Sequence, residues 1–102
     1  MERTSQDRFT EDKIQEMLAG LPGWKYNAEK VTIEKNFERK NFLDSVTFIQ
    51  QIAEIAEQQD HHPDLLLFDY KNVRAMLSTH SANGLTQNDF DLARSIEELY
   101  NK

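Results

Sequence analysis

Apolar positions recur with the 3.6-residue period of an α-helix in three stretches of the chain. The first stretch begins after Thr10, whose hydroxyl suits an N-cap, and ends near Gly20 and Pro22. The last begins after Thr86, where Asp89 at the N3 position gives a capping-box pattern. We therefore predict a helix near each end of the chain. Their apolar positions are Ile14, Met17, Leu18 and Leu21 in the first helix and Leu92, Ala93, Ile96, Leu99 and Tyr100 in the last.

A middle helix, predicted over residues 42–58, carries two apolar stripes instead of one. The first stripe comprises Phe42, Val46, Ile49, Ala53 and Ala56, and the second comprises Phe48, Ile52 and Ile55. At about 100° per residue the stripes are centred roughly 110° apart, which is wider than contact with one sheet requires. The surplus stripe predicts a partner, most simply a second copy of the same chain.

Between the helices the pattern changes to the period of two that is typical of strands. The strand-like segments are 24–26, 31–38, 64–70 and 73–80. Turns near 27–30 and 71–72 join them as two hairpins. We predict an α+β fold in the order α-β-β-α-β-β-α, with a four-stranded antiparallel sheet and three helices packed on one face. We expect residues 9–102 to form a single domain and residues 1–8, which are polar and patternless, to form a flexible tail.

Composition narrows the possible functions. A chain of 102 residues has room for one core. Its formal net charge of −6, with acidic and basic residues interspersed, argues against a nucleic-acid surface. The absence of cysteine excludes disulfides, thiolate metal sites and a cysteine nucleophile. No apolar run is long enough for a membrane span, and the segment MERTSQDRF lacks the apolar stretch of a secretory signal, so we expect a cytoplasmic protein.

The three histidines are the candidates for chemistry, because imidazole both donates and accepts protons near neutral pH. His61 and His62 are adjacent, and Pro63 biases His62 toward an extended backbone, so their side chains point to opposite sides. In a hairpin that turns near residue 71, residues 62 and 80 fall almost opposite each other. We therefore expect His80 to meet the adjacent pair at the open end of the hairpin.

Simpler interpretations stand beside this one. The adjacent histidines suit a solvated helix end, where a cation meets the negative end of the helix dipole. Asp89 is accounted for by its capping position and Glu57 by an exposed place on a helix. A metal site is disfavoured, because adjacent histidines seldom bind one ion and the i, i+4 spacing is absent. We predict no metal.

The complete spacing is more specific than any of its parts. Glu57-x3-His61-His62-Pro63 is followed after six residues by Tyr70, after nine more by His80 and after eight more by Asp89. This pattern resembles the signature of the pterin-4a-carbinolamine dehydratases. The resemblance extends to LSTHSANGLTQNDFDLA, to Trp24 after the first helix and to nearly the whole chain past residue 8.

The resemblance implies a lyase (hydro-lyase) that removes water from 4a-hydroxytetrahydropterin and gives quinonoid dihydropterin, in recycling the pterin of aromatic amino-acid hydroxylases. The pterin is the substrate, and no cofactor is implied. By analogy with the family, His61 and His80 are the proton-transfer pair and His62 chiefly holds the pterin. The remaining substrate-binding or orienting positions are Glu57, Pro63, Asp89 and, at the pocket rim, Trp24.

The resemblance also bears on partners. Family members are homodimers or homotetramers, which would account for the surplus stripe on the helix at 42–58. The resemblance also implies an alternative function. Animal members of the family double as dimerisation cofactors for a homeodomain transcription factor, and some relatives are assembly factors. A protein-interaction role, with or without enzyme activity, is therefore the second hypothesis. A metal-dependent hydrolase built on the three histidines is the third.

Overall fold

A computed structural model describes residues 8–102, and its elements follow the predicted order. The helices are α1 (Glu11–Leu18), α2 (Phe42–Gln59) and α3 (Gln87–Tyr100), and the strands are β1 (Lys25–Asn27), β2 (Thr32–Glu38), β3 (Asp64–Phe68) and β4 (Asn72–Leu77). A single 3-10 turn, η1 (His80–Ala82), follows β4. Of the predicted tail, only Arg8 lies within the described residues.

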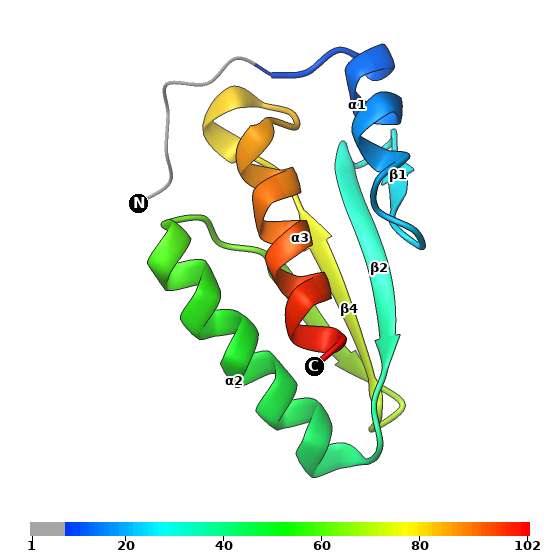
Figure 1. Ribbon diagram of the computed structural model, residues 1–102, viewed down its shortest axis with the longest axis vertical. Helices are drawn as coiled ribbons and strands as arrows, with labels where there is room; N and C mark the ends of the chain where they lie inside the picture. Colours follow the sequence, from blue (N-terminus) through cyan, green and yellow to red (C-terminus); the bar gives the residue numbers. More distant parts are fainter. Residues whose placement is uncertain (1–7) are drawn as a thin grey trace.

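The four strands form one antiparallel sheet in the order β1-β2-β4-β3, so β2 and β4 are the central strands. The helices lie on one face of this sheet, with α2 and α3 side by side across it and α1 near β1 (Figure 1). The α+β prediction is confirmed. The other face, called the outer face below, has no helix of residues 8–102 over it.

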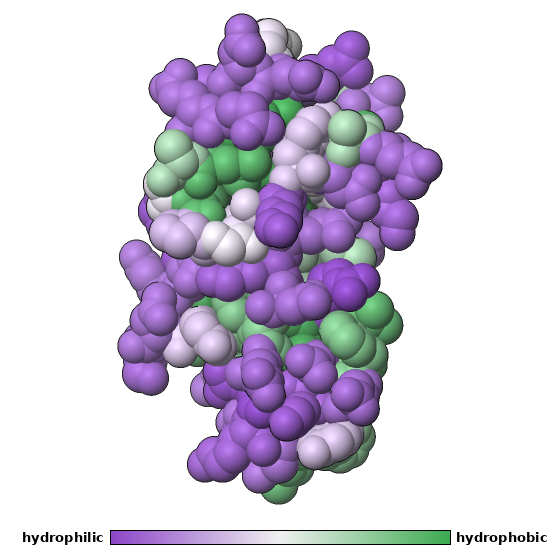
Figure 2. Space-filling view, turned by 90° about the vertical axis from the view of Figure 1, so that its right-hand side faces the viewer, coloured by the Kyte–Doolittle hydropathy of each residue, from purple (hydrophilic) through white to green (hydrophobic). Residues whose placement is uncertain are grey.

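Strand alternation divides the two faces of the sheet. On β4 the side chains of Val73, Ala75 and Leu77 are buried against the helices, as are Ile33 and Phe37 on β2. Each fully buried aliphatic or aromatic side chain contributes about 1.5–3 kcal/mol relative to an exposed one. The side of the molecule that holds α1, β1 and β2 is largely hydrophilic, with apolar residues showing in separate patches (Figure 2).

Helix α2 separates its two stripes as the sequence predicts. Phe48 and Ile52 are 1% and 0% exposed and pack in the core, whereas Phe42 is 56% exposed. Val46 and Ile49 are half-buried and Ala53 is exposed, so the stripe that contains them remains largely outside the core. Only Ala56, at the end of that stripe, is buried. The fold therefore leaves most of the first apolar stripe of α2 only partly covered.

The β3–β4 hairpin has a different register from the predicted one. Its loop includes Asp69 and Tyr70, both in the left-handed region with φ of 49° and 55°. Phe68 pairs with Asn72 and Asp64 with Met76, so the turn is centred on Tyr70, not on residue 71. Extended to the open end, this register places His62 opposite Ser78, so the predicted pairing of His62 with His80 is wrong by two residues.

Candidate active site

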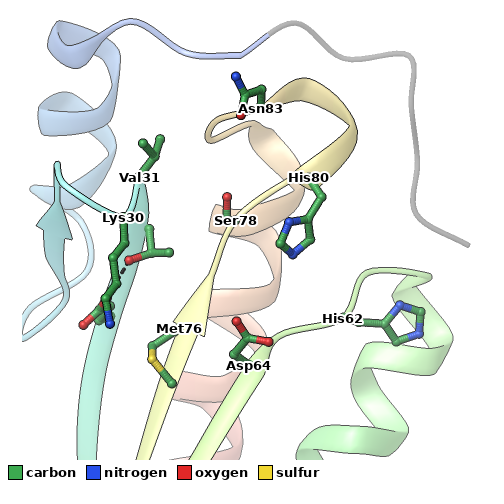
Figure 3. A pocket seen from close by; sticks show the side chains of 10 residues that line it. Lys30, Val31, His62, Asp64, Met76, Ser78, His80 and Asn83 are labelled. Carbon is green, nitrogen blue, oxygen red and sulfur yellow. Dashed lines mark hydrogen bonds between the residues drawn. The ribbon is translucent and has the colours of Figure 1, made fainter.

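A cavity of about 290 Å³ lies at the open end of the outer face, beside the ends of β2, β3 and β4 (Figure 3). Two of the three histidines, His62 and His80, line this cavity. The other lining residues are Lys30, Val31, Thr32, Glu34, Asp64, Met76, Ser78 and Asn83. Sequence analysis did not identify any of these eight as site residues. Alternation along the strands, with the correct register, would have placed Glu34, Asp64, Met76 and Ser78 on one face.

His80 is held by a closed turn. Thr79 and Gly84 form an isolated antiparallel bridge, with hydrogen bonds of 2.8 Å from Thr79 N to Gly84 O and 3.3 Å in return. Asn83 closes the turn in the left-handed region, with φ of 54°. The imidazole of His80 extends from this turn toward the cavity, with the Asp64 carboxylate across from it (Figure 3). The hydrogen-bonded turn thus presents an exposed imidazole.

His62 lies at the edge of the cavity nearest α2. Its ring is turned toward that helix, where Nε2 lies 2.7 Å from Glu57 Oε2 (Figure 3). The two side chains are 45% and 74% exposed, and an exposed pair of this kind contributes at most about 1 kcal/mol. The contact therefore sets a preferred orientation for His62 that a bound molecule could change at low cost.

His61 occupies a different environment from its neighbour. Helix α2 ends at Asp60, which adopts φ of 52°, and the chain then turns so that His61 N donates to Ala56 O at 3.1 Å. The imidazole is 1% exposed, and its Nε2 lies 2.7 Å from Asp89 Oδ1. His61 is not among the residues that line the cavity. The adjacent histidines do point apart, one into the core and one to the surface.

Asp89 collects several donors inside the core. In addition to the contact with His61, its Oδ2 accepts from Thr79 Oγ1 at 2.8 Å and from Thr86 N at 2.9 Å. The capping box predicted for Thr86 and Asp89 is present at the start of α3. Because Thr79 precedes His80 directly, this buried network connects His61 and α3 to the turn that carries His80.

Two predicted site residues lie elsewhere. Trp24 is 4% exposed, packs edge-to-face against Phe37 at 6.0 Å and donates from Nε1 to Glu97 Oε1 at 2.9 Å. It belongs to the core on the helix side of the sheet and does not line the cavity. Pro63 is half-buried between His62 and β3 and contributes no lining surface. The structure therefore brings neither residue to the cavity.

Within residues 8–102, no three His, Asp or Glu side chains are grouped closely enough to hold a metal ion. In the same range, no helix is both long enough and apolar enough to cross a bilayer.

The fold and the cavity define a small α+β domain that presents imidazole groups at the open end of a sheet. The chain belongs to the pterin 4 alpha carbinolamine dehydratase family, whose model matches residues 7–99. A protein of Sulfolobus acidocaldarius named a putative pterin-4-alpha-carbinolamine dehydratase is 41% identical over 92 residues, covering 90% of this chain and 98% of its own length. A mitochondrial Arabidopsis thaliana dehydratase is 39% identical, covering 89% of this chain and 50% of its own length.

Solved structures agree with this assignment. A transcriptional coactivator/pterin dehydratase from Brucella melitensis superposes with a TM-score of 0.86 at 35% identity, covering 92% of this chain and 99% of its own. A pterin dehydratase-like protein described as a RuBisCO assembly factor in the alpha-carboxysome superposes with a TM-score of 0.66 at 17% identity, covering 80% and 94%. The second likeness concerns the fold alone.

Proposed function

We propose that this protein dehydrates 4a-hydroxytetrahydropterin in the cavity that His62 and His80 line, returning the pterin of an aromatic amino-acid hydroxylase toward its reusable form. One observation carries the proposal, namely that two imidazoles of a chain in the dehydratase family share one cavity. A neutral imidazole accepts a proton and an imidazolium gives one, so two imidazoles in one cavity are the side chains suited to a reaction that needs both an acid and a base.

The reaction balances with these two groups alone. The C4a–O bond breaks, and the leaving oxygen takes a proton from an imidazolium and departs as water. The proton on N5 passes to a neutral imidazole, and its bonding electrons form the C4a=N5 double bond of quinonoid dihydropterin. One proton is given and one is taken, so the net charge of the enzyme is unchanged, and proton exchange with solvent restores the proton to the ring that gave it.

The distribution of roles differs from the one that the family resemblance implied. Burial of His61 beside Asp89 supports a positioning role for His61, exerted through Thr79 on the turn that carries His80. The exposed rings of His80 and His62 are then the proton-transfer pair, with His62 turning from Glu57 toward the substrate. Glu57 orients His62, and Pro63 separates the two adjacent rings.

A dehydration assay tests this proposal. Purified protein should accelerate water loss from freshly generated 4a-hydroxytetrahydropterin, equally with and without chelator. His80→Ala and His62→Ala should each lower the rate at least about tenfold, a threshold set below the 10²- to 10⁴-fold or so that a positioned acid or base supplies. Gln51→Ala, on the exposed side of α2, is the matched control and should retain the wild-type rate. A wild-type rate equal to that of buffer would end the proposal.

A second role is favoured by the surplus stripe on α2. We propose that this stripe joins two or more copies of the chain, with a heterologous protein as the alternative partner, as the coactivator name of the Brucella melitensis structure suggests. Ile49→Glu, on the half-buried stripe, should shift the protein to monomer in light scattering, whereas Gln50→Glu should not. A wild-type monomer at all concentrations would contradict self-association.

A further inference from the structure

Glu34 is the one carboxylate of the cavity that the structure holds in a fixed position. Its Oε2 accepts from Thr32 Oγ1 at 2.5 Å and from Asn27 Nδ2 at 3.3 Å. The amide of Asn27 is itself oriented, because its Oδ1 accepts from Lys30 N at 3.1 Å. These donors occupy one oxygen of the carboxylate. The other oxygen, Oε1, has no hydrogen-bond partner among residues 8–102, so an acceptor is prepared for a bound molecule.

Strand pairing places Glu34 relative to the rest of the cavity. Glu34 and Asp64 both pair with Met76, so the three residues form one row across the outer face. Adjacent strands are about 4.8 Å apart, which separates the two carboxylate-bearing backbones by about 10 Å. The apolar Met76 lies between them as a floor on which a flat ring can rest. Ser78 and then His80 follow just beyond the end of β4, toward the open end.

The two carboxylates of this row are not equivalent. Glu34 is partly buried and fixed by two hydrogen bonds, whereas Asp64 is exposed and its side chain makes no hydrogen bond or ion pair with other residues of the described range. Asp64 also follows the histidine pair in the chain and lies across from His80, on the reacting side. Glu34 lies on the opposite side of the Met76 floor, away from the histidine pair.

We propose that Glu34 Oε1 accepts the N–H edge of the 2-amino-4-oxopyrimidine half of a pterin and is the residue that selects this ring class. That edge carries two adjacent donors, the ring N3–H and the exocyclic amino group, which a carboxylate satisfies with charge-assisted hydrogen bonds. With this edge on Glu34, the opposite side of the ring faces the histidines. The inference rests on the proposed function for the identity of the ligand, and it concerns binding and not proton transfer.

Equilibrium binding of unreactive, fully oxidised pterin, followed by its own fluorescence, tests the inference. Glutamine in place of Glu34 is the same size, and its amide oxygen can keep the bonds to Thr32 and Asn27. Its amino group would then face the donors of the pterin and repel them. Glu34→Gln should raise the dissociation constant at least about tenfold, the loss expected for a charge-assisted bond. Glu38→Gln, on the same face at the other end of β2, is the matched control and should change it less than twofold.

A modified ligand separates recognition from support of the fold. The 2-dimethylamino analogue lacks the exocyclic N–H donors, so it should bind the wild type more weakly, and Glu34→Gln should affect its binding less than threefold. If Glu34→Gln weakened the binding of both ligands equally, Glu34 would support the cavity and would not bind the N–H edge of the pterin. That result would overturn the inference. The same would follow if Asp64→Asn, and not Glu34→Gln, gave the tenfold loss.

The inference and the proposed function fail in different ways. Wild-type dehydration with unchanged pterin binding by Glu34→Gln overturns the inference alone. Pterin binding that depends on Glu34, in a protein that does not accelerate dehydration, supports the inference and overturns the proposed reaction. A wild type that neither binds pterin nor dehydrates the carbinolamine overturns both.

Discussion

His61 Nε2 and Asp89 Oδ1 lie 2.7 Å apart, with the two side chains 1% and 0% exposed. The pair links residues 28 positions apart in sequence and ties the end of α2 to the start of α3. Asp89 also accepts from Thr79 and Thr86, so the loss of His61 would leave part of a buried network without its donor. Removal of one partner from a buried hydrogen-bonded pair is costly, because the remaining group cannot reach water.

We expect His61→Ala to lower the free energy of unfolding by about 3 kcal/mol, from the lost partner and the cavity left behind. His62→Ala is the matched control, because its exposed contact with Glu57 should contribute less than about 1 kcal/mol. Urea denaturation of the three proteins measures the difference. Equal stabilities for the two variants would mean that the buried pair does not support the fold.

The adjacency of His61 and His62 shows what the sequence could predict at this site. Pro63 and the two-residue period predicted that the rings point apart, and they do. The depth of each ring could not be predicted, because it depends on the left-handed Asp60 that ends α2 and turns His61 inward. The resemblance named His61, His62, His80 and Asp89 as one group, but the separation into a buried pair, His61 and Asp89, and a cavity pair, His62 and His80, depends on three-dimensional packing.

The same limit applies to the sheet. Alternation predicted four strands and their faces, because burial on one side leaves a clear period of two. The register of β3 and β4 could not be predicted from the sequence. It depends on Asp69 and Tyr70 both adopting positive φ, which the identities of these two residues do not specify. A shift of two residues keeps every side chain on its face and is therefore invisible to hydrophobic pattern. The row of Glu34, Met76 and Asp64 can therefore be recognised only from the observed register.

Asp44, near the start of α2, is expected to make stability depend on pH. The Lys40 backbone N–H donates to its carboxylate at 3.1 Å and the Arg39 guanidinium at 3.0 Å, and these contacts lower the pKa of Asp44 below its ordinary value. A carboxyl whose pKa is lower in the folded state adds stability above its unfolded pKa and loses it as pH falls through the folded pKa.

Asp44→Asn should therefore be less stable than the wild type by about 0.5–1 kcal/mol at pH 7, an amount limited by solvent screening of a surface group. The difference should shrink toward zero as the pH falls below 4, the region in which an ordinary aspartate is protonated. Denaturation curves at pH 7, 5 and 3 would measure it. A difference that stays constant over this range would show that the carboxylate charge has no part in the effect.

Val31 carries backbone strain at the edge of the cavity. Its φ of 57° lies in the left-handed region, which a β-branched residue rarely occupies at a cost of about 1–3 kcal/mol. Glycine relieves that strain, whereas alanine retains the Cβ that causes it. Both variants lose the contacts of the two γ-methyl groups, and the glycine variant also loses those of the Cβ. We expect Val31→Gly to be more stable than Val31→Ala by about 1 kcal/mol, the reverse of their usual order in regular structure. Thermal unfolding of the two variants would decide, and a more stable alanine variant would refute the account.

Trp24 lies in a different place from the one that the family resemblance implies. The family resemblance places it at the pocket rim, whereas the structure packs it against Phe37 with its Nε1–H on Glu97. Trp24→Phe keeps an aromatic ring in the core but leaves Glu97 without that donor, although Lys35 still pairs with it. We expect a loss of about 1–2 kcal/mol in unfolding free energy.

The dehydration rate of Trp24→Phe should remain within twofold of the wild-type rate at a temperature where both proteins are folded, because no atom of Trp24 lines the cavity. Circular dichroism at the assay temperature provides the check on folding. A tenfold loss of activity in a fully folded variant would mean that the indole reaches a substrate after all, either through movement of β1 or through its presentation to the cavity of another copy of the chain.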